Sequence, residues 1–211
     1  MVRKTAQDLW RSHRNLAEAC LEHPFVRGIA SGDLPRGSFE FYVGQDAFFL
    51  ESFARAYALA LAKAPDSSSM YTFLELLDGA LEELHLHRKY AEEWEIDLHP
   101  EPAFATRAYT DFLLRVAWSE PVDCIMAAMM PCMRLYAYLG QSLQPDLKPG
   151  SPYLDWVETY SSSGFEALAS RLEELFDEHA GDQKRIGRAE LHYHTAMELE
   201  IGFFQQAYQA R

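Results

Sequence analysis

Residues 38–64 read SFEFYVGQDAFFLESFARAYALALAKA, and this stretch decides the fold class. It contains no proline, the residue that breaks helix interiors, and alanine recurs at every second position from 54 to 64. Leucine and alanine favour helices, so the stretch predicts a long, buried helix. Ser38 belongs to a residue type preferred at helix N-caps, and we therefore expect the helix to begin there.

The whole chain has the same bias. Leu and Ala number 53 of the 211 residues, whereas the β-favouring Val, Ile and Thr together number 17. The composition therefore predicts an all-α protein. Prolines bound the other intervals in which we expect helices: 5–22, a short segment after Phe25, 69–95, 103–118, 121–143 with a bend at Pro131, 152–161, 163–180 and 186–209. No linker is evident, so we expect residues 1–211 to form a single domain, a bundle of eight or nine helices.

Charge and composition exclude several classes of protein. The net charge is −13, which argues against binding to nucleic acid or to an anionic membrane surface. No charge-free run approaches the roughly 20 residues that cross a bilayer, and no secretory signal is evident. The three cysteines, Cys20, Cys124 and Cys132, lack CxxC spacing and are too few for a disulfide scaffold. We therefore expect a cytoplasmic protein.

Two similar segments could bind a metal. They are Glu83-Leu84-His85-Leu86-His87 and Glu190-Leu191-His192-Tyr193-His194. On a helix, Glu83 and His87 share a face, as do Glu190 and His194. Two such pairs on facing helices could form a di-iron site of the kind found in helical bundles. The alternative is that these residues lie on the solvated faces of an acidic protein.

Two carboxylates lie on otherwise apolar helix faces. Asp46 has Tyr42 and Phe49 on its face, and Glu200 is followed by two phenylalanines one turn later. A carboxylate among aromatic rings is costly unless it has a partner, and its pKa is often shifted toward values useful for proton transfer. Both are candidate acid/base residues. The alternative is that each forms an ion pair at the rim of the core.

Cys132 is the candidate nucleophile. It follows Pro131, which removes a backbone donor and can open a helix toward a cavity, and Tyr136 lies one turn later on the same face. A buried cysteine in a Met-rich helix is also a common core residue. Tyr109 and Tyr160 add flat rings with hydroxyls, which suit a planar heteroaromatic ligand.

The chain resembles the TenA family, the thiaminase II group of thiamin salvage. The resemblance is carried, in order, by Trp10, His23-Pro24-Phe25-Val26, the segment 28–35, Phe39, Tyr42, Gln45-Asp46, Tyr109, Pro131-Cys132, Tyr136, the segment 153–160, Glu200-Ile201-Gly202-Phe203-Phe204 and Ala207-Tyr208. It implies a haem-oxygenase-like helical bundle without haem or another cofactor, assembled as a homotetramer. It also implies hydrolysis of 4-amino-5-aminomethyl-2-methylpyrimidine to the hydroxymethylpyrimidine and ammonia, and in many members hydrolysis of thiamin.

The resemblance also assigns roles to residues. Cys132 matches the nucleophile and Glu200 the acid/base. Asp46 matches the carboxylate that holds the ring amidine. Tyr136, Tyr160 and Tyr109 match pocket residues, whereas Phe49 stands where many members carry a tyrosine near the nucleophile.

The expected partner is therefore a small pyrimidine, with no nucleic acid and no membrane. Two alternatives stay open: a metal-dependent oxidase or oxygenase built on the Glu/His pairs, and a non-catalytic regulatory protein. The acidic charge and the lack of a helix-turn-helix pattern argue against direct DNA contact.

Overall fold

The computed structural model describes residues 4–180 and 183–210, and within them it has helices but no β-strand. Ten α-helices and one short 3₁₀ turn follow one another: α1 (Ala6–Ser12), α2 (Arg14–Leu21), α3 (Pro24–Ser31), α4 (Arg36–Ala62), α5 (Ser67–Trp94), α6 (Phe104–Ser119), α7 (Val122–Leu143), η1 (Gln144–Asp146), α8 (Leu154–Ser161), α9 (Ser163–His179) and α10 (Gln183–Gln209). The expected all-α class is confirmed.

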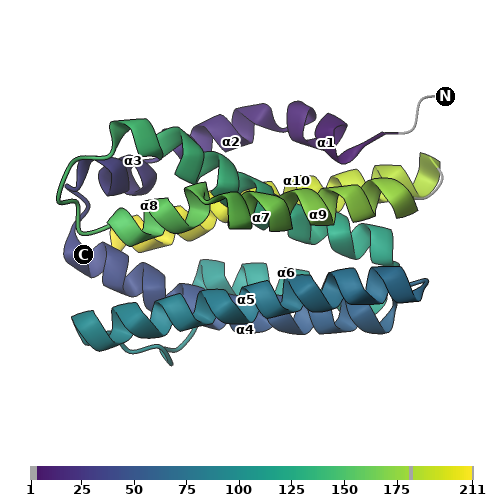
Figure 1. The fold of residues 1–211 in the computed structure, drawn as a ribbon, viewed down its shortest axis with the longest axis horizontal. Coiled ribbons are helices and arrows are strands. Elements are labelled where there is room, and N and C mark those ends of the chain that lie inside the picture. Colours follow the sequence, from purple (N-terminus) through teal and green to yellow (C-terminus); the bar gives the residue numbers. More distant parts are fainter. Residues whose placement is uncertain (1–3, 181–182, 211) are drawn as a thin grey trace.

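The helices lie nearly along one axis (Figure 1). Helices α4 and α5 form an antiparallel pair along one side of the bundle, and α1, α2 and α3 lie along the opposite side. Helix α7 is the centre of the core because it packs against α6, α8, α9 and α10. It is long and apolar enough to cross a membrane, but 83% of its most apolar window is buried inside the bundle. Its apolar surface thus faces the other helices of the bundle.

One expected helix is divided in two, and one expected helix start is wrong. The interval 5–22 is not one helix, because it breaks at His13, whose ring packs against Tyr193 and His194 of α10. This break accounts for the tenth helix. Ser38 is not an N-cap: α4 begins two residues earlier, after Pro35, and the Ser38 hydroxyl donates a hydrogen bond to the backbone oxygen of Ala210. The hydroxyl thus ties α4 to the C-terminal end of the chain.

One lysine forms hydrogen bonds to the C-terminal end of α6. Lys63, just after α4, donates from Nζ to the backbone oxygens of Ala117, Trp118 and Glu120 at 2.7, 2.8 and 2.9 Å. Carbonyls at a helix C-terminus lack intrahelical partners and carry partial negative charge, so the ammonium group satisfies three of them. It also fixes the approach to α7, the helix that carries Cys132.

Candidate active site

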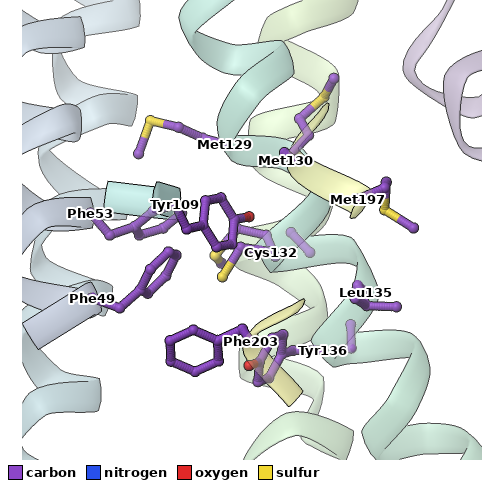
Figure 2. Close-up of a cluster of buried hydrophobic side chains, with 14 of the residues drawn as sticks. Phe49, Phe53, Tyr109, Met129, Met130, Cys132, Leu135, Tyr136, Met197 and Phe203 are labelled. Carbon is purple, nitrogen blue, oxygen red and sulfur yellow. The ribbon is translucent and has the colours of Figure 1, made fainter. Parts of the chain in front are cut away.

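Cys132 lies at the centre of the core on α7, which continues through Pro131. Its side chain sits among the rings of Tyr109, Tyr136 and Phe203 (Figure 2). The residue is 8% exposed. Burial raises the pKa of the thiol well above its usual range, and the charges of nearby Glu200, Glu83 and Asp46 raise it further. The resting side chain is thus a thiol, and a base is needed to make it a nucleophile.

Glu200 is a buried carboxyl group that can hold a proton near neutral pH. It is only 1% exposed on α10, and the hydroxyl of Tyr109, from α6, donates to its Oε1 at 2.8 Å. Burial raises the pKa of Glu200 to about 8, against the lowering effect of the Tyr109 hydrogen bond, and the charge of Asp46 also raises it. A group with this pKa can give and take protons at pH 7–8.

Asp46 has a buried histidine as its partner. The Nε2 of His87, on α5, lies 2.8 Å from Asp46 Oδ2, and its Nδ1 lies 3.0 Å from the backbone oxygen of Glu83. A carbonyl only accepts, so Nδ1 donates. Burial lowers the pKa of His87, but the hydrogen bond and charge of Asp46 and the charge of Glu83 outweigh it, and the net shift is upward. The raised pKa favours the protonated ring, which donates from both of its nitrogens within the core.

Glu83 is the third carboxyl group of the site. It lies one turn before His87 on α5 and accepts a hydrogen bond from the hydroxyl of Tyr160 on α8. Burial raises the pKa of Glu83 to about 7; the charge of Asp46 adds to this, and Tyr160 and His87 oppose it. Two carboxyl groups, Glu83 and Glu200, thus titrate near neutrality beside one thiol.

Aromatic side chains form the walls between these groups. The Tyr136 ring lies 4.8 Å from the Tyr160 ring and 5.8 Å from that of Trp156, measured between centroids. The Trp156 indole donates to the Tyr42 hydroxyl, which donates to that of Tyr136, both at 3.3 Å. These hydrogen bonds fix the rings, and flat faces with hydroxyl rims suit a planar heterocycle.

Phe49 closes the site from α4. Its ring lies 4.8 Å from the Tyr109 ring and 5.9 Å from the Phe203 ring. A tyrosine hydroxyl at this position would face the Cys132 side of the cluster, and phenylalanine supplies only apolar surface there. Phe49 itself therefore offers no hydroxyl to the thiol.

A cavity of about 390 Å³ reaches Glu83 from the side of the bundle. Residues of α5, α7, α8 and α9 line it, among them Met133 and Phe165. The Phe165 ring meets the Tyr160 ring edge-on at 5.0 Å. The hydrogen bond from Tyr160 to Glu83 thus lies between this cavity and the buried cluster.

The structure brings together all the residues that the sequence singled out as site residues, namely Cys132, Glu200, Asp46, Tyr136, Tyr160, Tyr109 and Phe49. The sequence missed the contacts of Glu83 and His87 with Tyr160 and Asp46. Their shared helix face was visible in the i,i+4 spacing. What was not visible is that this face turns inward, onto α4 and α8.

The two Glu/His segments do not come together in the way that a shared di-iron site would need. Glu83 and His87 contact Tyr160 and Asp46, whereas Glu190 forms an ion pair with Lys4 and His194 lies 3.5 Å from Glu198. The two pairs thus face different parts of the molecule, because α5 lies beside α4 and α9 whereas α10 lies beside α6 and α7. They cannot share a di-iron centre.

The amino-acid sequence is similar to those of known proteins. A profile of the TENA/THI-4/PQQC family matches residues 10–210. An aminopyrimidine aminohydrolase of Halalkalibacterium halodurans is 34% identical, over 98% of this chain and 96% of that protein. A thiamine biosynthesis multifunctional protein of Corynebacterium glutamicum is also 34% identical, over 94% of this chain but only 26% of that longer protein.

Two solved structures show the same fold. A TenA family transcription regulator from a Silicibacter species superposes with a TM-score of 0.88 at 29% identity, over 95% of this chain and 94% of that one. Haem oxygenase-1 from the cyanobacterium Synechocystis, in complex with haem, gives a TM-score of 0.65 at 17% identity, over 97% and 92% of the two chains. The likeness to haem oxygenase shows the fold alone, and it confirms the expected haem-oxygenase-like bundle.

Proposed function

The chain belongs to the TENA/THI-4/PQQC family, and from that premise we propose that it hydrolyses aminopyrimidines in thiamin salvage. The substrate class follows from the H. halodurans relative, which is named an aminopyrimidine aminohydrolase and matches nearly end to end. One observation carries the proposal: a buried thiol, Cys132, shares an aromatic pocket with two carboxyl groups whose pKa values lie near 7 and 8. Such a pair can supply a base and an acid at the same pH.

Asp46 and the surrounding rings would hold the pyrimidine. His87 occupies Oδ2 of Asp46, which leaves Oδ1 to accept from the amidine nitrogens of a protonated ring in a charge-assisted hydrogen bond. The rings of Tyr136 and Tyr160 offer stacking surface. We place the entrance at the cavity beside Glu83, where the Phe165 and Tyr160 rings meet.

The reaction then needs one nucleophile and two proton carriers. Glu83 takes the proton of the Cys132 thiol. The sulfur bonds to the unsubstituted ring carbon beside the carbon that bears the aminomethyl group, and the displaced electron pair of the ring moves to the protonated ring nitrogen. Glu200 gives a proton to the amine, which leaves as ammonia when the ring electrons form the exocyclic methylene. Water adds to that carbon and returns a proton to Glu200. The thiolate then leaves with its electron pair and regains its proton from Glu83.

The decisive experiment measures ammonia release from 4-amino-5-aminomethyl-2-methylpyrimidine and, separately, cleavage of thiamin. We expect Cys132→Ser to reduce both rates to background while the circular dichroism spectrum and the melting temperature stay close to those of the parent. Cys124→Ala is the matched control, because Cys124 is also a buried cysteine of α7 but lies eight residues before Cys132. Full activity of Cys132→Ser would refute the proposal.

We also propose that the protein is a cytoplasmic homotetramer. Met70, Leu74 and Leu81 lie exposed on one face of α5, and Phe104 and Trp118 are 91% and 71% exposed on α6. Apolar groups exposed together on one helix face, as on α5, mark interaction surfaces. Light scattering coupled to gel filtration tests this, and a charged substitution such as Leu74→Glu should lower the mass if the α5 face is an interface.

A further inference from the structure

A second cluster of reactive side chains lies away from the pocket, where the turn between α6 and α7 meets α10. Glu120 precedes α7, Cys124 lies in its first turn, and His192 lies on α10. One ligand atom from each residue, the carboxylate oxygen, the sulfur and the ring nitrogen, lies within 4.8 Å of the other two. Nothing in the proposed chemistry of the pocket uses these three groups.

The environment of His192 indicates that a ligand binds here. The residue is 7% exposed, and its buried Nε2 has no hydrogen-bond partner among the residues that the structure describes. The nearest carboxylate oxygen, Oε1 of Glu120, lies 3.8 Å away, too far for a hydrogen bond. Burial lowers the pKa of His192, which favours the neutral ring. A neutral buried imidazole nitrogen without a partner is costly, and a metal ion is one group that would satisfy it.

The other two groups supply complementary donors. Cys124 is fully buried, and burial, followed by the charges of Asp123 and Glu120, raises the pKa of its thiol to about 12. A metal displaces the proton of a coordinating thiol outright. Glu120 accepts from Arg188 Nη1 at Oε2, at 2.7 Å, which leaves Oε1 directed at His192. Sulfur, imidazole nitrogen and carboxylate oxygen are the three donor types that zinc binds.

We propose that Glu120, Cys124 and His192 bind one Zn²⁺ ion, with an exogenous molecule such as water in the fourth position. Zinc bonds of about 2.0–2.3 Å in a tetrahedron place the donor atoms about 3.3–3.8 Å apart. The Glu120–His192 distance of 3.8 Å already reaches this range. The other separations, at most 4.8 Å, need to contract by about 1 Å, within reach of small side-chain rotations at Glu120 and Cys124.

Charges of both signs act on the site. Arg188 is paired with Glu120, and Arg185 lies 3.5 Å from Oδ2 of the buried Asp123. Lys63 Nζ donates to the backbone oxygen of Glu120 at 2.9 Å, and the charge of Arg115 acts on the His192 ring. The thiolate formed on binding offsets half of the charge of the zinc ion, so the Cys124 and Glu120 ligands have to outweigh Lys63 and Arg115 for the ion to bind.

The site would tie α7 to α10 without touching the proposed reaction. Cys124 lies eight residues before Cys132 on α7, and His192 lies eight residues before Glu200 on α10, so each ligand is about 12 Å along its helix from the corresponding group of the pocket. Zinc would thus hold together the two helices that carry the nucleophile and the acid. We expect its contribution to be to stability, with little effect on turnover at low temperature.

The test uses the full chain, stripped with a chelator and titrated with Co²⁺ and then with Zn²⁺. Co²⁺ should give a thiolate-to-metal charge-transfer band that saturates at one ion per chain, and Zn²⁺ should abolish it and raise the melting temperature. Cys124→Ala should remove the band, and His192→Gln should weaken binding by more than the 10–100-fold typical of outer-shell changes. The matched controls are Cys20→Ala and His194→Gln, the latter altering a partly exposed histidine two residues along α10.

Three results would overturn the proposal. They are the absence of the band in the parent protein, a band that persists in Cys124→Ala, and equal loss of Co²⁺ affinity in His192→Gln and His194→Gln. Misfolding cannot produce a false confirmation, because circular dichroism of each variant is recorded before the titration and because the two ligand variants report independently. The proposal stands apart from the function of the pocket: the Cys132→Ser protein should bind zinc as the parent does.

Discussion

Replacing Tyr109 with phenylalanine should move the alkaline limb of the pH–rate profile upward. The Tyr109 hydroxyl donates to Glu200 at 2.8 Å, and this hydrogen bond favours the charged carboxylate. Burial raises the pKa of Glu200 to about 8 even with this hydrogen bond in place. In the proposed reaction Glu200 must be protonated to release ammonia, so activity should fall as the pH rises through that value.

The size of the shift follows from the energy of the bond. A hydrogen bond to a charged group contributes about 1.5–3 kcal/mol, and one pKa unit corresponds to about 1.4 kcal/mol. Tyr109→Phe should therefore move the alkaline limb upward by about one to two pH units. The acid limb, set by the need for ionised Glu83, should stay in place, because its hydrogen bond comes from Tyr160 and not from Tyr109.

The assay is kcat/KM for ammonia release between pH 5 and 10, for the parent, Tyr109→Phe and Tyr193→Phe. Tyr193 is a fully buried tyrosine whose hydroxyl has no hydrogen-bond partner, so its substitution controls for loss of a buried oxygen. Ionisation of the substrate affects all three profiles equally, and a difference between them therefore belongs to the enzyme. An alkaline limb that stays in place or moves downward in Tyr109→Phe would refute the assignment of Glu200 as the acid.

Three further substitutions test the structure around the site. Gly140→Ala should destabilise the fold by at least about 2 kcal/mol in urea unfolding and lower kcat, because the new Cβ would lie 2.5 Å from the backbone of Tyr160 and Ser161. Lys63→Met should cost about 1–3 kcal/mol by the same measurement, since the end of α6 loses its three hydrogen bonds from Nζ. Glu200→Gln should flatten the pH dependence of the free energy of unfolding. The pKa of Glu200 rises from its ordinary 4.5 to about 8 on folding, so the folded parent binds an extra proton between these two values. The free energy of unfolding of the parent should therefore fall by on the order of 2–5 kcal/mol as the pH rises from 5 to 8.

Patterns local in sequence predicted the fold well. Most helices lie in intervals without proline, because a proline disrupts only the helical turn in which it lies. The expected ends of most helices are within a few residues of the observed ones. The break at His13 was not predictable in this way. It depends on the packing of that ring against Tyr193 and His194, which are far away along the chain.

Patterns local in sequence marked the site residues but not their partners. Asp46 and Glu200 stood out because a carboxylate on an aromatic helix face must find a donor. The donors, His87 and Tyr109, are separated from them by 41 and 91 residues, and only the packing of α4 on α5 and of α6 on α10 brings them together. The Glu83/His87 pair has the spacing of a solvated face, and no property of its own segment shows that it turns toward the core.

The pocket holds three carboxyl groups, Asp46, Glu83 and Glu200, and this gathering of acidic groups suits it to a cationic substrate. His87 lies against Asp46, and its charge also acts on Glu83. Glu83 and Glu200 each accept a hydrogen bond from a tyrosine hydroxyl, and burial keeps both of them partly protonated near neutral pH. A protonated pyrimidine brings a positive charge. Its arrival lowers the cost of ionising Glu83, the base that Cys132 needs, so the thiol would be activated mainly when a substrate is bound, and a bulk reagent would meet an inert, buried thiol.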